Sequence, residues 1–315
     1  MAPVEAEIMT AVARPALRGH IAMLTFSALV AGSFSLGALA ANEIAPSAIT
    51  TVRFAIAAVL LGALAIVGPG LRRAYFAAPW RYFLLGGLFA AYFVLMFEGL
   101  KTAPPVSTSA VFTLTPLMSA AFGWLWLRQV TTPRMAAALA IGGAGALWVI
   151  FRGDPRALAA FEVGRGEAIF FVGCIAHAAV TPLLRKLNRG EPPLVSTALV
   201  MVGGTILLVG WGWSDLRATA WLELPAIVWA TLFYIAVFAS AVTFSLLQYA
   251  ALRLPSAKVM AYTYLVPSWV ILWELALGQG VPPLLAVPGV VLTAAALMIL
   301  LKNEDPAPTG AGVAK

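Results

Sequence analysis

Polar side chains that could bind a small solute recur inside long apolar stretches of this 315-residue chain. His177 lies in the middle of one stretch, on a stripe with Phe170, Cys174 and Thr181. The spacing of four, three and four residues places this stripe on one face of a helix. A polar group in hydrocarbon tends to face a partner or a wet cavity, because its isolation is costly. His177 is therefore predicted either to bind a solute or to join two helices by a hydrogen bond.

Two further stretches place hydroxyl or amide groups among apolar residues. One helical face carries Tyr234, Phe238, Ala241, Ser245 and Gln248. We predict that this face lines a cavity; the alternative is interhelical packing, with Tyr234 and Gln248 as interfacial anchors. Another stripe, Leu85, Phe89, Tyr92 and Met96, predicts core packing. Tyr92 is the exception on that stripe, because its hydroxyl needs a partner when buried.

The chain repeats one unusual pattern. Residues 97–116 read FEGLKTAPPVSTSAVFTLTP and residues 249–267 read YAALRLPSAKVMAYTYLVP. Each has an aromatic residue, a Leu, a cation, a break with proline, and then a proline inside an apolar run: Pro116 or Pro267. A proline leaves the carbonyl four residues earlier without its N–H partner, so the helix bends. We predict paired hinges at these prolines; packing alone is the alternative.

Thr113 and Tyr264 each lie three residues before their proline, so the repeat makes them equivalent. We predict that they lie beside the freed carbonyls near the membrane midplane, where hydroxyls and carbonyls could bind a substrate ammonium. For Thr113 the alternative is a hydroxyl that bonds back to its own helix.

Three of the charged residues inside the apolar runs could take part in transport. Glu98 and Glu274 fall near outer ends, where either could carry a proton and couple transport to a proton gradient; Glu98 is the first candidate. The alternative is an interfacial carboxylate in water. Arg53 lies about one and a half turns into its run, where it is predicted to snorkel, to pair with Glu43 or to attract a carboxylate.

The composition indicates an integral membrane protein, with 62% hydrophobic residues, 10% charged residues and a mean hydropathy of +0.93. Two His and one Cys exclude an intrachain disulfide and a Cys/His metal cage, so we expect no metal and no cofactor. No HExxH, GxxxxGK[ST] or helix-opening GxGxxG motif is present, so we expect no enzyme; a membrane-embedded enzyme is the weaker alternative. The net charge of +7 does not indicate a nucleic-acid partner, because in a chain that lies in the lipid bilayer the positions of the charges matter more than their sum.

The apolar runs predict an all-α polytopic fold with ten transmembrane helices, since a crossing needs about 20 residues. The runs are 20–41, 47–68, 82–100, 105–127, 134–151, 167–184, 194–212, 225–250, 257–277 and 284–301. The first twenty residues lack the features of a signal peptide, so the first run is expected to remain. Fourteen of the 20 cations fall on one side and five on the other, which predicts that both termini are cytoplasmic.

The repeat divides the chain into two halves of five spans, so the second half is predicted to be inverted relative to the first. The predicted units are an N-terminal cytoplasmic segment 1–19, a first repeat 20–151, a periplasmic loop 152–166, a second repeat 167–301 and a disordered cytoplasmic tail 302–315. Runs one to four and six to nine should enclose the site, and runs five and ten should be scaffold.

These motifs resemble EamA-type members of the drug/metabolite transporter superfamily, over nearly the whole chain and as two copies of a five-span unit. The resemblance is carried by residues 251–258 (ALRLPSAK), 264–267 (YLVP), 52–54 (VRF) and 142–145 (GGAG). The chain departs from the family's pattern at Gln129 and Gly280, where a Glu is usual, and at Glu98, where many relatives have Ala.

Within this superfamily the chain is similar to bacterial exporters of amino acids, including aromatic ones. The resemblance implies a secondary transporter of the bacterial inner membrane that exports small metabolites by alternating access. Tyr92, Tyr234 and Tyr264 would then stack on an aromatic substrate. The alternatives are a drug carrier or a nucleotide-sugar carrier of the same fold; the latter should hold several cations for its diphosphate.

Overall fold

The computed structural model describes residues 3–160, 162–280 and 284–301. Over these residues the chain forms helices and turns without a strand, and ten segments are long and apolar enough to cross a membrane. The predicted fold class, an all-α protein with ten candidate membrane spans, is confirmed. The tail 302–315 lies outside the described residues.

Most spans are single helices, but spans 4, 8 and 9 are divided into shorter segments. Spans 1 to 5 are α1 (Pro3–Ala40), α2 (Pro46–Val67), α3 (Trp80–Leu100), α4 (Pro105–Phe112) with α5 (Thr115–Leu127), and α6 (Pro133–Ile150). Spans 6 to 10 are α8 (Arg165–Leu187), α9 (Pro193–Trp211), α11 (Ala226–Ala236) with η3 (Val237–Val242) and α12 (Thr243–Ala251), α13 (Ser256–Ala261) with η4 (Tyr262–Leu265) and α14 (Val266–Ala276), and η5 (Leu284–Ala286) with α15 (Val287–Leu301). The connections carry η1 (Arg73–Phe76), α7 (Pro155–Ala160), α10 (Trp213–Ala218) and η2 (Trp221–Glu223).

Proline marks the beginning of several spans. Helices α2, α4, α6 and α9 each carry proline in their first turn, where no N–H is needed for the helix ladder. Helix α1 begins at Pro3, although the first apolar run begins near residue 20. The helix continues because residues 3–14 are rich in Ala, Glu and Met, which favour helix.

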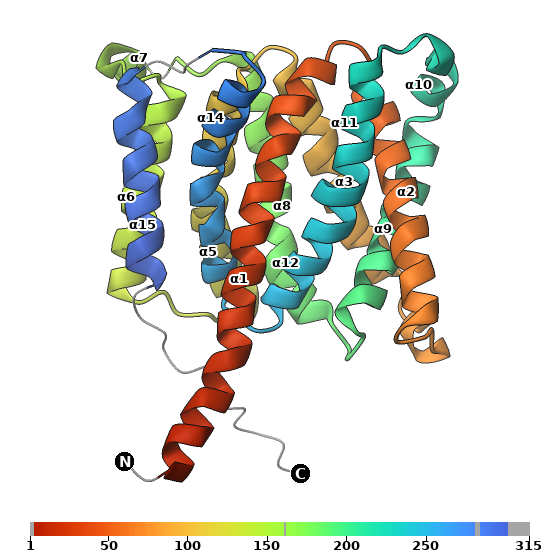
Figure 1. Ribbon diagram of the computed structural model, residues 1–315, viewed down its shortest axis with the longest axis vertical. Helices are drawn as coiled ribbons and strands as arrows, with labels where there is room; N and C mark the ends of the chain where they lie inside the picture. Colours follow the sequence, from red (N-terminus) through yellow and green to blue (C-terminus); the bar gives the residue numbers. More distant parts are fainter. Residues whose placement is uncertain (1–2, 161, 281–283, 302–315) are drawn as a thin grey trace.

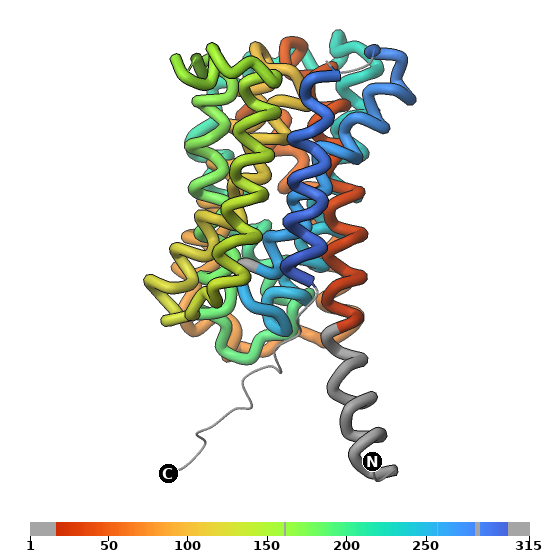
Figure 2. Tube along the Cα trace, turned by 90° about the vertical axis from the view of Figure 1, so that its left-hand side faces the viewer, coloured from red at the N-terminus to blue at the C-terminus, as the bar shows by residue number. Residues whose placement is uncertain are grey.

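The helices pack side by side in one bundle (Figure 1). Helix α3 packs against α8 and α9, and α1 packs against α11, α12 and α14. The contact of span 3 with span 6 thus has a counterpart in the contact of span 8 with span 1. Helices α6 and α15 pair at the margin of the bundle (Figures 1 and 2). Helix α15 ends on the side from which α1 enters the bundle (Figure 1).

Spans 4 and 9 are interrupted at the sites that the prolines predict. Pro116 lies in the first turn of α5, and Pro267 lies in the first turn of α14. Each proline therefore starts a new helical segment after a break. The two spans cross, because α4 packs against α14 and α5 packs against α13. At the crossing the hydroxyls of Thr115 and Thr263 lie 3.3 Å apart, so the two breaks touch.

A buried ion pair fixes the loop between spans 6 and 7 to span 3. Arg81 Nη2 lies 2.7 Å from Glu191 Oε1, and the two side chains are 3% and 2% exposed. Arg81 Nη1 also donates to Leu187 O at 2.6 Å, and the backbone N–H of Arg189 donates to Glu191 Oε2 at 2.7 Å. Burial raises the pKa of Glu191, but the hydrogen bonds from Arg81 and Arg189 outweigh it and hold this pKa below 4.5.

This ion pair predicts an acid-sensitive contribution to stability. Because the pKa of Glu191 is lower in the folded protein, the pair stabilises the fold at neutral pH, and this contribution is lost as the pH falls through the folded pKa. We expect Glu191→Gln to lower the unfolding free energy at pH 7 by about 1–3 kcal/mol and therefore to lower the Tm. The fall of the Tm toward pH 4 should be flatter in this variant than in wild type. Thermal melts of purified protein measure this. The exposed Glu43, changed to Gln, is the control, and equal pH profiles for Glu191→Gln and wild type would contradict the assignment.

Candidate functional site

His177 lies at the centre of the bundle, enclosed by aromatic rings. The side chain, on α8, is 2% exposed. Its ring centroid lies 4.4 Å from that of Tyr92, 5.1 Å from that of Phe112 and 5.7 Å from that of Phe89. Its Nδ1 is buried and has no hydrogen-bond partner among the residues that the structure describes. The structure thus brings together two of the predicted site residues, His177 and Tyr92, and leaves a polar atom in the box that they form with two Phe rings.

Arg53 lies beside this aromatic box and is fully buried. Its Nε and Nη2 donate to Ser240 Oγ at 3.0 and 2.8 Å, and Nη2 also donates to Ala239 O at 3.0 Å. Its guanidinium carbon lies 3.6 Å from the ring centroid of Phe93. Arg53 therefore neither snorkels nor pairs with Glu43, which is exposed. A lone Arg inside an apolar run was the signal in the sequence, but its partners lie about 190 residues away and could not be identified.

The aromatic residues of α3 connect Arg53 to His177 through contacts between rings. Phe93, under Arg53, lies 4.6 Å from Tyr92 and 5.6 Å from Phe244, centroid to centroid. Phe244 in turn stacks on Phe89 at 4.1 Å. We define Arg53, Phe89, Tyr92, Phe93, Phe112, His177 and Phe244 as the central cluster. It draws on spans 2, 3, 4, 6 and 8, so both halves of the chain build it.

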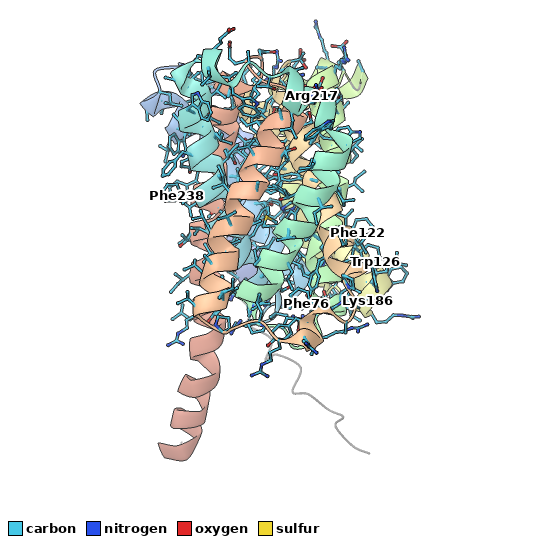
Figure 3. All side chains as sticks on the ribbon, turned by 90° about the vertical axis from the view of Figure 1, so that its right-hand side faces the viewer. Phe76, Phe122, Trp126, Lys186, Arg217 and Phe238 are labelled. Atoms are coloured by element: carbon cyan, nitrogen blue, oxygen red, sulfur yellow. The ribbon has the colours of Figure 1, made fainter. Side chains whose placement is uncertain are left out.

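The predicted cavity face of span 8 is not continuous. Segment η3 is a π-helix, and one extra residue per turn rotates the following side chains by about 100° around the axis. Tyr234 donates to Leu29 O at 2.9 Å, and Phe238 is 38% exposed on the outer face of the bundle (Figure 3). Ser245 donates to Ala241 O at 2.8 Å in its own helix.

Gln248 joins span 8 to span 7, since its Nε2 lies 3.1 Å from Ser196 Oγ. In this conformation Tyr234, Ser245 and Gln248 therefore make helix contacts outside the central cluster. Their contacts in this conformation are those of packing between helices, which was the alternative interpretation for span 8.

The carbonyls that the hinge prolines leave behind have new partners. Phe112 O accepts the hydroxyl of Thr115 at 2.7 Å, and Thr263 O accepts the backbone N–H of Val266. Thr113 donates to Ala110 O at 2.6 Å, which is the back-bonding alternative. Each of these two carbonyls thus already accepts one hydrogen bond within its own span in this conformation.

Two other candidates lie apart from the central cluster. Tyr264 is fully buried, and its hydroxyl lies 3.4 Å from Leu139 O on α6. Glu98 is partly exposed at the end of α3, where its carboxylate lies 2.7 Å from Lys101 Nζ. Glu98 is thus an ion-paired carboxylate near a span end.

Two of the hollows on the surface of the molecule lie away from the central cluster. A hollow of about 410 Å³ lies at one end, among Glu43, Asp215, Glu223 and their neighbours, where Ser47 donates to Asp215. A second hollow of about 310 Å³ lies between α5 and α6, beside Leu117 and Trp124. Neither hollow is lined by a residue of the central cluster. The rings of that cluster are packed against one another, so this conformation is closed around His177 and Arg53.

Known proteins match this chain over most of its length. The profile of the EamA-like transporter family matches residues 17–151 and again residues 164–302. The uncharacterized transporter YyaM of Bacillus subtilis (strain 168) is 24% identical over 265 residues, which cover 83% of this chain and 87% of YyaM. A crystal structure of another protein matches with a TM-score of 0.66 at 20% identity, over 92% of this chain and 96% of that one, and so shares the fold. Two profile matches that together span most of the sequence establish that the chain belongs to the EamA-like transporter family.

Proposed function

We propose that this transporter exports amino acids, aromatic ones first, across the bacterial inner membrane by alternating access. The observation that carries the proposal is the central cluster: aromatic rings from both halves enclose the unpartnered Nδ1 of His177 deep in the bundle. Aromatic faces stack on an aromatic solute, and a buried polar atom without a partner favours a ligand that can bond to it. The closed packing fits an occluded state between two open ones.

The crossing of spans 4 and 9 supports alternating access. Their breaks touch through Thr115 and Thr263 beside the central cluster, which includes Phe112 of α4. A change of bend at either break would alter the distance between the halves around the cluster. Segments related by inverted repeats commonly move in this way about a fixed site. By the positive-inside rule we assign the side where α15 ends to the cytoplasm.

Flux measurements test the function directly. Purified protein in liposomes is expected to move labelled phenylalanine and tryptophan without modifying them, and excess unlabelled phenylalanine should compete. Covalent change of the solute would indicate an enzyme. Competition by drugs or nucleotide sugars, but not by amino acids, would replace the proposed substrate class.

His177 should contribute to this flux. Because its Nδ1 has no protein partner, we expect His177→Ala to lower kcat/KM about tenfold or more, the equivalent of one lost hydrogen bond to the solute. Cys174→Ala is the matched control, since Cys174 is buried on the same face of α8. Normal flux through well-folded His177→Ala would remove His177 from the site.

Glu98 remains our candidate for proton coupling. Liposomes with an imposed pH gradient should show faster flux if a proton accompanies the solute. Glu98→Gln should then flatten the pH dependence while binding stays measurable. A pH profile like that of wild type in Glu98→Gln would assign the carboxylate to its surface ion pair with Lys101 alone.

A further inference from the structure

Arg53 is a buried cation without an anion. It is fully buried within span 2, and none of the ion pairs among the described residues includes it. A guanidinium inside a membrane is expensive unless it is neutralised, and such residues commonly mark a solute pathway. Three hydrogen bonds and the face of Phe93 compensate the charge in part, but none of these partners is negative.

One nitrogen of Arg53 is left over. A guanidinium has five N–H groups, and Nε and Nη2 have partners on span 8. Nη1, which carries two N–H groups, is buried and has no hydrogen-bond partner in the described part of the chain. A buried donor without an acceptor is costly, so this atom favours any ligand that brings an acceptor oxygen. A carboxylate supplies both the acceptor and the missing negative charge.

The contacts of Arg53 are with a segment of unusual geometry. Ala239 and Ser240 lie in η3, the π-helical turn of span 8, and Ala239 O accepts a hydrogen bond from Nη2. The sequence VFASAV contains neither Gly nor Pro that would explain the distortion. π-helical turns occur frequently at functional sites. An anion on Arg53 would compete with Ser240 and Ala239 and so would connect ligand binding to the shape of span 8.

The neighbouring rings fit an aromatic acid. Phe93 covers one face of the guanidinium. The ring of Phe93 also contacts that of Tyr92, and the ring of Tyr92 contacts that of His177. We propose that Arg53 is the anion subsite of this transporter, with Nη1 as donor to the carboxylate of the solute and the rings of the central cluster around its aromatic body. This inference rests on the proposed function, which it extends by requiring a carboxylate on the solute. Amines of the same shape should not be carried.

Three probes of one shape test the subsite: phenylalanine, phenylpropionate, which lacks the amine, and phenethylamine, which lacks the carboxylate. In detergent-solubilised wild type, phenylpropionate and phenylalanine should bind and raise the Tm, and phenethylamine should do neither. Arg53→Gln removes the charge and keeps N–H donors, and it should weaken the binding of the two carboxylates by about 30-fold or more without strengthening the binding of the amine. Arg53→Lys should keep the preference for carboxylates with lower affinity.

Ser240→Ala separates binding from packing. It removes the main partner of the guanidinium on span 8 but leaves the charge. It should therefore keep the ratio of phenylpropionate to phenethylamine affinity near that of wild type, whereas Arg53→Gln should collapse that ratio. An equal collapse in both variants, or wild type that binds the amine as tightly as the acids, would overturn the proposal. If the arginine variants do not fold, the Tm shifts of wild type with the three probes still decide.

The outcomes also distinguish this inference from the proposed function. Wild type that binds phenylpropionate through Arg53 but does not transport phenylalanine would retain the anion subsite and reject amino-acid export. Wild type that transports phenylalanine with unchanged affinity in Arg53→Gln would retain export and reject the subsite.

Discussion

Pro116→Ala and Pro267→Ala are expected to shift the transporter toward opposite access states. Each proline begins the second half of an interrupted span, and a continuous helix through that site would suffer a penalty of about 3 kcal/mol. With alanine the N–H at position 116 can bond to Phe112 O, which now accepts the hydroxyl of Thr115. The span can then straighten. Because the two halves are predicted to be inverted, straightening span 4 and straightening span 9 should favour opening on opposite sides.

Cysteine accessibility from each side of the membrane measures this shift. Single cysteines near either end of the bundle are introduced after Cys174, the only cysteine of the chain, is replaced. Labelling should rise on one side in Pro116→Ala and on the other side in Pro267→Ala, and turnover should fall in both. Pro182→Ala is the control, because Pro182 lies inside the uninterrupted helix α8. Shifts of the same sign in both variants would contradict opposed hinges.

Much of the fold follows from local sequence. Ten apolar runs give the spans within a few residues, since length and hydropathy alone determine what can cross a membrane. The breaks in spans 4 and 9 follow from Pro116 and Pro267, because a missing N–H acts on its own helix wherever that helix lies. The repeated pattern also anticipated that the two breaks are equivalent, and they meet at Thr115 and Thr263.

The π-helical turn in span 8 could not be predicted from the sequence. It changes which side chains of span 8 lie on one face of the helix. Ala239 and Ser240 accept hydrogen bonds from Arg53, which is distant in sequence, so the contacts of this turn could not be read from the local sequence. We predicted the stripe from Tyr234 to Gln248 by assuming an uninterrupted helix with 3.6 residues per turn. The π-helical turn η3 interrupts that period, so the stripe is not continuous beyond it. His177 and Tyr92 were identified singly as polar groups in apolar runs. Their proximity depends on the packing of α8 against α3, which no local pattern specifies.

The second large prediction comes from the packing of α3 against α9 and concerns two adjacent glycines of α3. A Cβ on Gly86 would lie 2.4 Å from the backbone N of Gly204 and 2.5 Å from Val200 O, both on α9. Backbone atoms cannot move aside as a side chain can, so spans 3 and 7 would have to separate. A Cβ on Gly87 would meet only the end of the Leu207 side chain, at 3.1 Å. Close contact through small residues is a common basis of helix association in membranes.

We therefore expect Gly86→Ala to cost about 1–3 kcal/mol or more through overpacking and to reduce both folded yield and Tm sharply. Gly87→Ala should be neutral, or stabilising by up to about 1 kcal/mol, because alanine favours helix. Helix α6, at the margin of the bundle, offers a second pair of glycines for the same comparison. A Cβ on Gly145 would lie 2.6 Å from Gly289 O on α15, whereas one on Gly143 would meet nothing within 4 Å. Size-exclusion profiles and thermal melts of the four variants give the order. Equal stability of Gly86→Ala and Gly87→Ala would mean that spans 3 and 7 are not in backbone contact, and it would contradict the packing of α3 against α9.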